Sequence, residues 1–121
     1  MFLVASNRSK QLLILQYVAQ IQASELRRGM DDIQAQLAEL SAGFRLLVDL
    51  SLSETMDLDC VPELGRMMDL IDRAGVGQVV RVIPNPQKDI GFNILSIFHY
   101  SHHPRIHTCE TLAEAGRLLS L

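Results

Sequence analysis

The residues best suited to chemistry in this 121-residue chain lie in the segment M-D-L-D-C-V-P-E-L-G, residues 56–65. Asp57, Asp59 and Cys60 place two carboxylates and a thiol at the expected start of a helix. The helix dipole favours a thiolate at this position, whereas the neighbouring carboxylates oppose it by charge repulsion. The other fate of a free cysteine is burial as a small apolar side chain. The sequence favours a packed Cys60 and leaves a reactive one as the alternative.

The carboxylates of this segment raise a second possibility, a site for a divalent cation. Glu54, Asp57 and Asp59 offer the oxygen ligands that Mg²⁺ and Ca²⁺ prefer. Their spacing matches none of the defined calcium loops. Because an aspartate before a helix commonly caps it and complements its dipole, we expect Asp57 or Asp59 to cap the helix, and we expect no metal or cofactor.

Four histidines form the densest titratable group. His99 and His102 have a three-residue spacing that zinc sites use, but Ser101 and Pro104 indicate that the helix has ended there. The same short segment supplies no further ligand type, and no nucleophile is evident for a histidine base to activate. We expect solvated loop histidines, with a zinc site or a histidine-based hydrolase as weaker alternatives, on His99, His102, His103 and His107.

Length and composition limit the class of protein. A chain of 121 residues can bury a core without cross-links, so we expect one domain spanning residues 1–121. The net charge of −3 and the pI near 5.7 give no electrostatic reason to expect nucleic acid as a partner. Cys60 and Cys109 indicate neither a disulfide framework nor a metal site, which fits the cytoplasm. The apolar run at residues 1–5 is too short for a signal peptide or a membrane span.

Hydrophobic periodicity predicts strands that alternate with helices. The first two strands read as a hairpin around a polar turn at residues 6–10. The predicted strands are residues 2–5, 11–19, 44–50, 78–83 and 105–109. A strand–helix alternation of this kind implies right-handed crossovers and therefore parallel strands, so a mixed sheet should form the centre.

Four helices are expected between and after these strands. The first begins at an N-cap Ser24, and the second contains Pro62 in its first turn. A Thr111-x-x-Glu114 capping box opens the last helix. We expect the third helix, residues 89–100, to turn Ile90, Ile94, Leu95 and Phe98 inward. The expected inward positions of the first and last helices are Leu26, Met30, Ile33, Leu37 and Leu40, and Leu112, Ala115, Leu118 and Leu119.

Three segments carry a resemblance to a known family. The run F-R-L-L-V-D-L-S with M-D-L-D-C-V-P-E-L-G-R-M-M-D-L-I-D-R-A-G resembles the STAS domain, the SpoIIAA-like fold of anti-sigma-factor antagonists. The segments V-V-R-V-I-P-N-P and C-E-T-L-A-E-A-G-R-L-L are also similar to it. The resemblance spans nearly the whole chain. It implies an α/β domain with a mixed, mostly parallel sheet of about five strands and four helices.

The resemblance also implies a function. In antagonists of this family an anti-sigma kinase phosphorylates the serine of an Asp-Ser-x-Gly element. Asp59 matches that aspartate, Cys60 takes the place of the serine, and Pro62 stands where the family has glycine. The chain is therefore similar to a degenerate branch that lacks the phosphorylatable serine, some members of which resemble Sec14-type lipid-binding domains.

We therefore expect a non-enzymatic regulatory module that binds a protein partner, with a homodimer as a further option and no catalytic residue. The expected recognition or switch residues are Asp57, Leu58, Asp59, Cys60 and Val61, and exposed apolar side chains at Leu52, Met56, Leu58 and Val61 would support this role. The alternative is a small-ligand or lipid carrier, which needs an apolar cavity near Phe92, Ile97, Phe98 and Tyr100.

Overall fold

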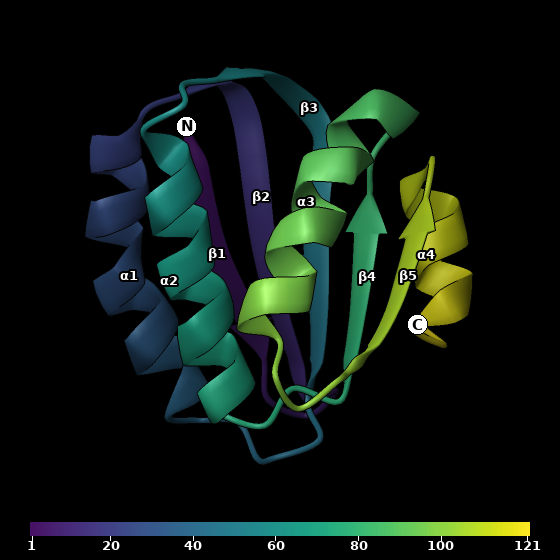
Figure 1. Cartoon of the computed structure of the whole chain (residues 1–121). Helices are drawn as coiled ribbons and strands as arrows, with labels where there is room; N and C mark the ends of the chain where they lie inside the picture. Colours follow the sequence, from purple (N-terminus) through teal and green to yellow (C-terminus); the bar gives the residue numbers. More distant parts are fainter.

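Five strands and four helices form an α/β structure in the computed structural model, which describes residues 1–121 apart from the side chain of Pro86 (Figure 1). The strands make one sheet in the order β1-β2-β3-β4-β5. Strand β1 runs antiparallel to β2, and the other neighbours are parallel. The predicted mixed, mostly parallel sheet is confirmed.

The strands extend over Phe2–Asn7 (β1), Leu12–Ile21 (β2), Arg45–Met56 (β3), Gln78–Val82 (β4) and Arg105–Cys109 (β5). The predicted hairpin of β1 and β2 is confirmed. The prediction that the third strand ends at residue 50 is wrong, because β3 continues beside β2 until Met56 pairs with Ile21. Residues 51–56 are polar apart from Leu52 and Met56, and the pairing of β3 with β2 rather than an apolar run makes them a strand.

The helices divide between the two faces of the sheet. Helices α1 (Ala23–Leu37), α2 (Cys60–Arg73) and α3 (Pro86–His99) lie over one face, and α4 (Leu112–Leu118) covers the other (Figure 1). Alternate strand residues follow this division, because successive side chains of a strand point to opposite faces. Leu13 and Leu15 belong to the main core under α1 to α3, whereas Leu12 belongs to a second cluster under α4.

The ends of two helices differ from the sequence prediction. Helix α1 begins at Ala23 with Gln22 at the N-cap position, so the prediction of Ser24 as N-cap is wrong. Helix α3 begins three residues before the predicted start, at Pro86. Asn85 caps it, with its Oδ1 accepting a hydrogen bond of 3.1 Å from Gln87 N. A proline in the first turn is compatible with this start because its missing N–H would be unpaired there anyway.

Helix α4 combines a confirmed start with a wrong face. The capping box is confirmed, since Thr111 Oγ1 accepts a hydrogen bond of 3.1 Å from Glu114 N. Ala115 and Leu119 are buried as predicted, but Leu112 and Leu118 are exposed. The helix has only seven residues, which is too few to bury both flanks of its apolar stripe.

The largest error concerns the face of α3. Ile90, Ile94 and Phe98 were expected to point inward, and all three are more than half exposed. Phe92 and Ser96 are buried in their place. The cause is a buried arginine under this helix, described below. No helix in the described part of the chain is long and apolar enough to cross a membrane.

Candidate functional site

The junction between β3 and α2 is a tight turn that presents its side chains to solvent. Cys60 N donates to Asp57 O at 2.9 Å and Val61 N donates to Leu58 O at 3.1 Å, so the turn leads directly into the helix. Leu58 at its tip is 86% exposed. We call the exposed apolar residues Leu52, Leu58 and Val61, with the exposed carboxylates Asp57 and Asp59, the junction surface.

Two details of the junction differ from the expected capping and exposure. Asp59 occupies the N-cap position, but its backbone is helical (φ −65°, ψ −11°) and its side chain makes no capping hydrogen bond, so the predicted carboxylate cap is wrong. Met56 is partly buried against the core. Both aspartates therefore remain free to face solvent beside Leu58.

Cys60 is packed into the core. Its side chain is fully buried and its Sγ lies 3.6 Å from the carbonyl oxygen of Ile21. Burial raises the pKa of the Cys60 thiol, and the charges of Asp57 and Asp59 raise it further. A neutral thiol without access to solvent has neither the charge nor the exposure that a reactive cysteine needs. Among the two alternatives for this residue, the structure supports packing.

A buried arginine that the sequence reasoning did not single out determines the orientation of α3. Arg81 lies in β4 with 1% of its side chain exposed. Its guanidinium donates a hydrogen bond of 2.8 Å to Ser96 Oγ and a second hydrogen bond to Asn93 Oδ1. Its Nε lies 3.2 Å from Asp89 Oδ1, so the two side chains form an ion pair. Burial lowers the pKa of Arg81, and the Asp89 carboxylate opposes this by stabilising the charged form.

The three partners of Arg81 occupy one stripe of α3, at positions i, i+4 and i+7, in which Ser96 is buried, Asp89 is partly buried and Asn93 is exposed. A buried charge must be paired, and this requirement holds Ser96 inward together with the apolar Phe92 and Leu95. The other large apolar residues of the helix face solvent and form what we call the α3 ridge, made of Ile90, Ile94, Ile97 and Phe98. A lone arginine in an apolar strand, followed by Asp89-x₃-Asn93-x₂-Ser96, was the sequence signal for this arrangement.

A groove connects the junction surface to the α3 ridge. It has a volume of about 320 Å³ and lies between α2 and α3. Its lining comes from Val61 and Leu64 of α2 and from Lys88, Gly91, Phe92, Ile94 and Leu95 of α3. Exposed apolar residues on both sides of a groove are typical of an interface rather than of an ordinary solvated surface.

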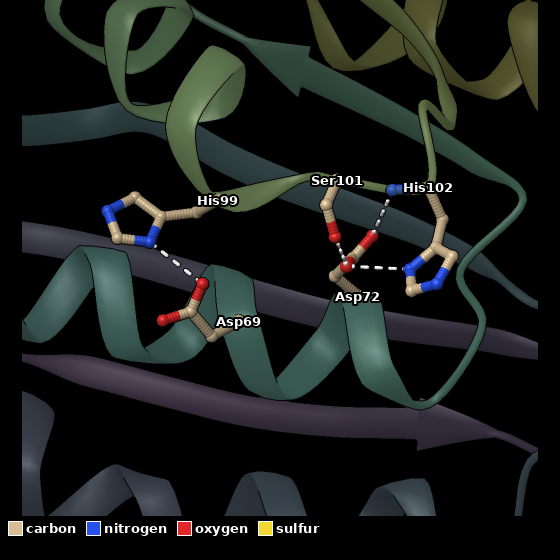
Figure 2. A network of polar contacts seen from close by, with 5 residues as sticks. All are labelled: Asp69, Asp72, His99, Ser101 and His102. Carbon is tan, nitrogen blue, oxygen red and sulfur yellow. Dashed lines mark hydrogen bonds and ion pairs between the residues drawn. The ribbon is translucent and has the colours of Figure 1, made fainter.

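Two of the four histidines pair with aspartates of α2, as Figure 2 shows. His99 Nδ1 lies 2.8 Å from Asp69 Oδ1. Asp72 accepts hydrogen bonds from Ser101 Oγ at 2.8 Å and from the backbone N–H of His102 at 3.2 Å, and its Oδ2 lies 2.8 Å from His102 Nδ1. These contacts fasten the C-terminal end of α3 and the following turn to α2.

Asp72 is the centre of this network. Its side chain is almost fully buried. Burial by itself raises the pKa of Asp72, but the hydrogen bonds from Ser101 and His102 outweigh it and hold the pKa below the ordinary value. In the described part of the chain neither paired imidazole is hydrogen-bonded to a hydroxyl or a thiol, so the aspartate–histidine pairs have no nucleophile to activate.

The four histidines do not gather at one place. His103 and His107 are exposed, with His103 in a loop and His107 on β5. The expectation of a solvated loop residue is wrong for His99, which is helical and paired. Among the described residues no group of three or more histidine, cysteine, aspartate or glutamate side chains is placed to hold a metal ion. The geometry that a metal hydrolase requires is therefore missing from these residues.

The core beneath α3 is filled. The space enclosed between the helices and the sheet near Tyr17, Arg81, Phe92 and Tyr100 has a volume of about 20 Å³, which is close to the room that one water molecule needs. A shallow surface groove of about 310 Å³ lies beside Ile97 and Tyr100 on the opposite flank of α3. The interior therefore has no room for a lipid chain at this place.

Comparisons with known proteins identify the fold. No protein-family model matches the chain, and no curated protein matches it in sequence. The structure of the anti-sigma factor antagonist SpoIIAA in its unphosphorylated form matches with a TM-score of 0.66 at 15% identity, over 99% of this chain and 98% of that one. The chain has the SpoIIAA-like (STAS) fold.

A second solved structure supports the same SpoIIAA-like fold. It is an uncharacterized protein of the DUF3478 family from Shewanella loihica PV-4, with a TM-score of 0.73 at 11% identity, over 98% of this chain and 92% of that one. In the present chain Cys60 is buried, and the residues directly before and after it, Asp59 and Val61, are exposed.

Proposed function

We propose that residues 1–121 act as one non-enzymatic regulatory domain that binds a protein partner through the junction surface. The observation that carries the proposal is the exposure of Leu58 at the tip of the turn, between Leu52 and Val61. Covering such an exposed apolar side chain with a partner is favourable by roughly 25 cal/mol per Å² of apolar surface removed from water. The likeness to an anti-sigma factor antagonist supports a regulatory role in the cytoplasm.

The chemistry of the junction argues for binding without a phosphorylation switch. Cys60 has no hydroxyl, and its side chain is closed off beneath Ile21. The surface carries Asp57, Asp59 and Glu54 around its apolar residues, so a complementary partner has an apolar patch flanked by lysine or arginine. Regulation of such binding would come from the partner or from its concentration.

The direct test is affinity capture from the native cell with three forms of the chain. Wild type is compared with Leu58→Asp, which places a charge at the centre of the junction surface, and with Leu112→Asp, which changes another exposed leucine, on α4. A protein that is retained by wild type and Leu112→Asp but lost with Leu58→Asp supports the proposal. The purified partner should then bind Leu58→Asp at least about tenfold more weakly in calorimetry, as for a central interface residue.

Two outcomes would contradict the proposal. A partner that binds all three forms equally uses another surface. Recovery of a lipid or small molecule, with no protein lost on Leu58→Asp, would favour the alternative of a ligand carrier, for which the α2–α3 groove offers an apolar surface site of about 320 Å³.

A further inference from the structure

The α3 ridge is an exposed apolar surface separate from Leu58. Its four side chains, Ile90, Ile94, Ile97 and Phe98, are between 51% and 77% exposed. Together they present on the order of 400 Å² of apolar surface, the size at which patches on monomeric proteins are often functional. Stable interfaces bury about 800 Å² on each partner, so the ridge with its flanking groove supplies a large part of one interface.

The charges of α3 are all engaged within the chain. Lys88 Nζ donates to the carbonyl oxygens of Ser53 at 3.1 Å and Glu54 at 2.9 Å. Asp89 pairs with Arg81, and His99 pairs with Asp69. The outward side of the helix is therefore uncharged, which gives a charged partner nothing to pair with. The outward side of α3 therefore fits a partner surface that is also apolar and uncharged. The same side of α3 in a second copy of the chain is such a surface.

The spacing of the residues in the α3 ridge also allows the ridge to pack against the ridge of a second copy. When two identical helices pack antiparallel across a twofold axis, the residue four positions before the axis faces the residue four positions after it. With the axis at Ile94, Ile90 of one copy faces Phe98 of the other. Gly91 then faces Ile97 of the other copy. Apart from the helix's own backbone and the two neighbouring residues, no atom lies within 4 Å of the position that a Cβ would take at Gly91. The glycine provides the hole, and the isoleucine fills it.

We propose that the α3 ridge is the interface of a symmetric homodimer in which two α3 helices pack antiparallel, with the twofold axis at Ile94. The antiparallel direction follows from charge. Lys88 ties the start of α3 to the end of β3, so Asp57 and Asp59 lie near that end of the helix. A parallel pair would bring these carboxylates of both copies together and align the helix dipoles unfavourably. This interface goes beyond the junction surface, since it does not use Leu58.

The first test is the mass in solution. Wild type should elute from a sizing column with light scattering at twice the 13.5 kDa of the chain. Ile94→Arg places two positive charges at the axis and should give a monomer, whereas Leu58→Asp should remain a dimer. Circular dichroism and thermal unfolding of Ile94→Arg show that the variant is folded, which is expected for a residue that is half exposed. A monomeric wild type, or a dimer that persists in Ile94→Arg, would overturn the proposal.

The second test fixes the geometry and does not depend on the arginine variant. At a twofold axis a residue meets its own copy, so Ile94→Cys should form an intermolecular disulfide when diamide takes up the two thiol hydrogens. Ile90→Cys is the matched control. The two copies of residue 90 are eight residues apart along the helix pair, about 12 Å, beyond the roughly 7 Å that a disulfide spans.

Wild type should not cross-link, because both of its cysteines are buried. Cross-linking of Ile90→Cys with no cross-linking of Ile94→Cys would rule out the antiparallel pair. The outcome is separable from that of the proposed function, because partner capture depends on Leu58 and the dimer depends on Ile94. A chain that fails to dimerise but still loses its partner in Leu58→Asp would overturn this inference alone.

Discussion

Helices α2 and α3 lie side by side on the same face of the sheet, yet they use their amphipathic patterns in opposite ways (Figure 1). Helix α2 buries Leu64, Met67, Met68 and Ile71 and exposes Arg66 and Arg73. Helix α3 turns a polar stripe toward Arg81 and exposes its isoleucines. The comparison teaches that a helical hydrophobic pattern shows which residues share a face, whereas the partner beneath the helix determines whether that face is buried.

The largest expected effect comes from removing the positive charge of Arg81 beneath α3. Arg81→Met should lower the free energy of unfolding by about 3–5 kcal/mol, because Asp89 would stay largely buried with no cation to pair with. Urea unfolding measures the loss. Adding Asp89→Leu and Asn93→Leu to Arg81→Met should restore much of the stability, since an apolar contact replaces the unpaired groups. A loss below 1 kcal/mol in the single variant would mean that Arg81 does not hold α3.

A matched pair of truncations compares the two helices directly. Met67→Ala on α2 should cost about 2–5 kcal/mol, because it empties part of the core. Ile97→Ala on α3 should change the stability by no more than about 0.5 kcal/mol in dilute protein, because its side chain is already in solvent. Both values come from chemical unfolding at the same protein concentration. Similar losses at the two sites would show that the α3 ridge is buried after all.

The connection between the two helices depends on Asp72 and should weaken in acid. Asp72→Asn should cost about 1–2 kcal/mol at pH 7, because it weakens the hydrogen bonds with Ser101 and His102. The pKa of Asp72 in the folded chain is below its ordinary value of 3.8, so its contribution is present above that pH and is lost as the pH falls through the folded pKa.

Urea unfolding of wild type and Asp72→Asn between pH 7 and pH 3 tests this dependence. The difference between the two proteins should shrink as the pH falls below about 4. Asp69→Asn, which changes a half-exposed carboxylate, is the control and should cost less than about 1 kcal/mol. A difference that grows as the pH falls below about 4 would contradict the sign of the Asp72 shift.

The smallest effect concerns the close approach of α2 and α3. A Cβ at Gly65 would lie 2.6 Å from His99 Nε2, so Gly65→Ala forces the imidazole away from Asp69. The overpacking costs about 1–3 kcal/mol and exceeds the gain of about 1 kcal/mol in helix propensity, so a net loss of about 1 kcal/mol is expected. In a His99→Ala background the same change should stabilise by about 1 kcal/mol. A double-mutant cycle checks the reversal, and the absence of coupling would refute the contact.

The parts of the fold that were predicted correctly depend on local signals. The hairpin, the strand–helix alternation and the Thr111 capping box follow from turn residues, periodicity and hydrogen bonds between near neighbours. Three boundaries were predicted wrongly: the helix starts at Ser24 and Asp89, and the end of β3. The true boundaries depend on contacts with distant segments. Asn85 and Ser24 are equally good capping residues by type. Asn85 caps α3 and Ser24 does not cap α1, because the position of each helix start depends on the path of the chain that enters from β4 or from β2.

The candidate site was predicted in part. The junction was located from Pro62 and the preceding aspartates, and the exposure of Leu58 and Val61 agrees with the expected recognition surface. The pairing of His99 and His102 was not foreseen, because their aspartates lie about 30 residues earlier on another helix. The spacing of residues along the sequence indicates partners within one helix or strand, and it does not indicate partners on a different helix.

The order of the elements and the polar and apolar stripes of each helix follow from the amino-acid sequence, because side-chain periodicity is set by the local geometry of helices and strands. The tertiary structure alone decided which stripe of α3 faces inward. A guanidinium brought under α3 by β4 must be paired, and the cost of leaving it unpaired outweighs the burial of three isoleucines. That choice puts the α3 ridge in solvent, next to the groove that leads to the junction surface.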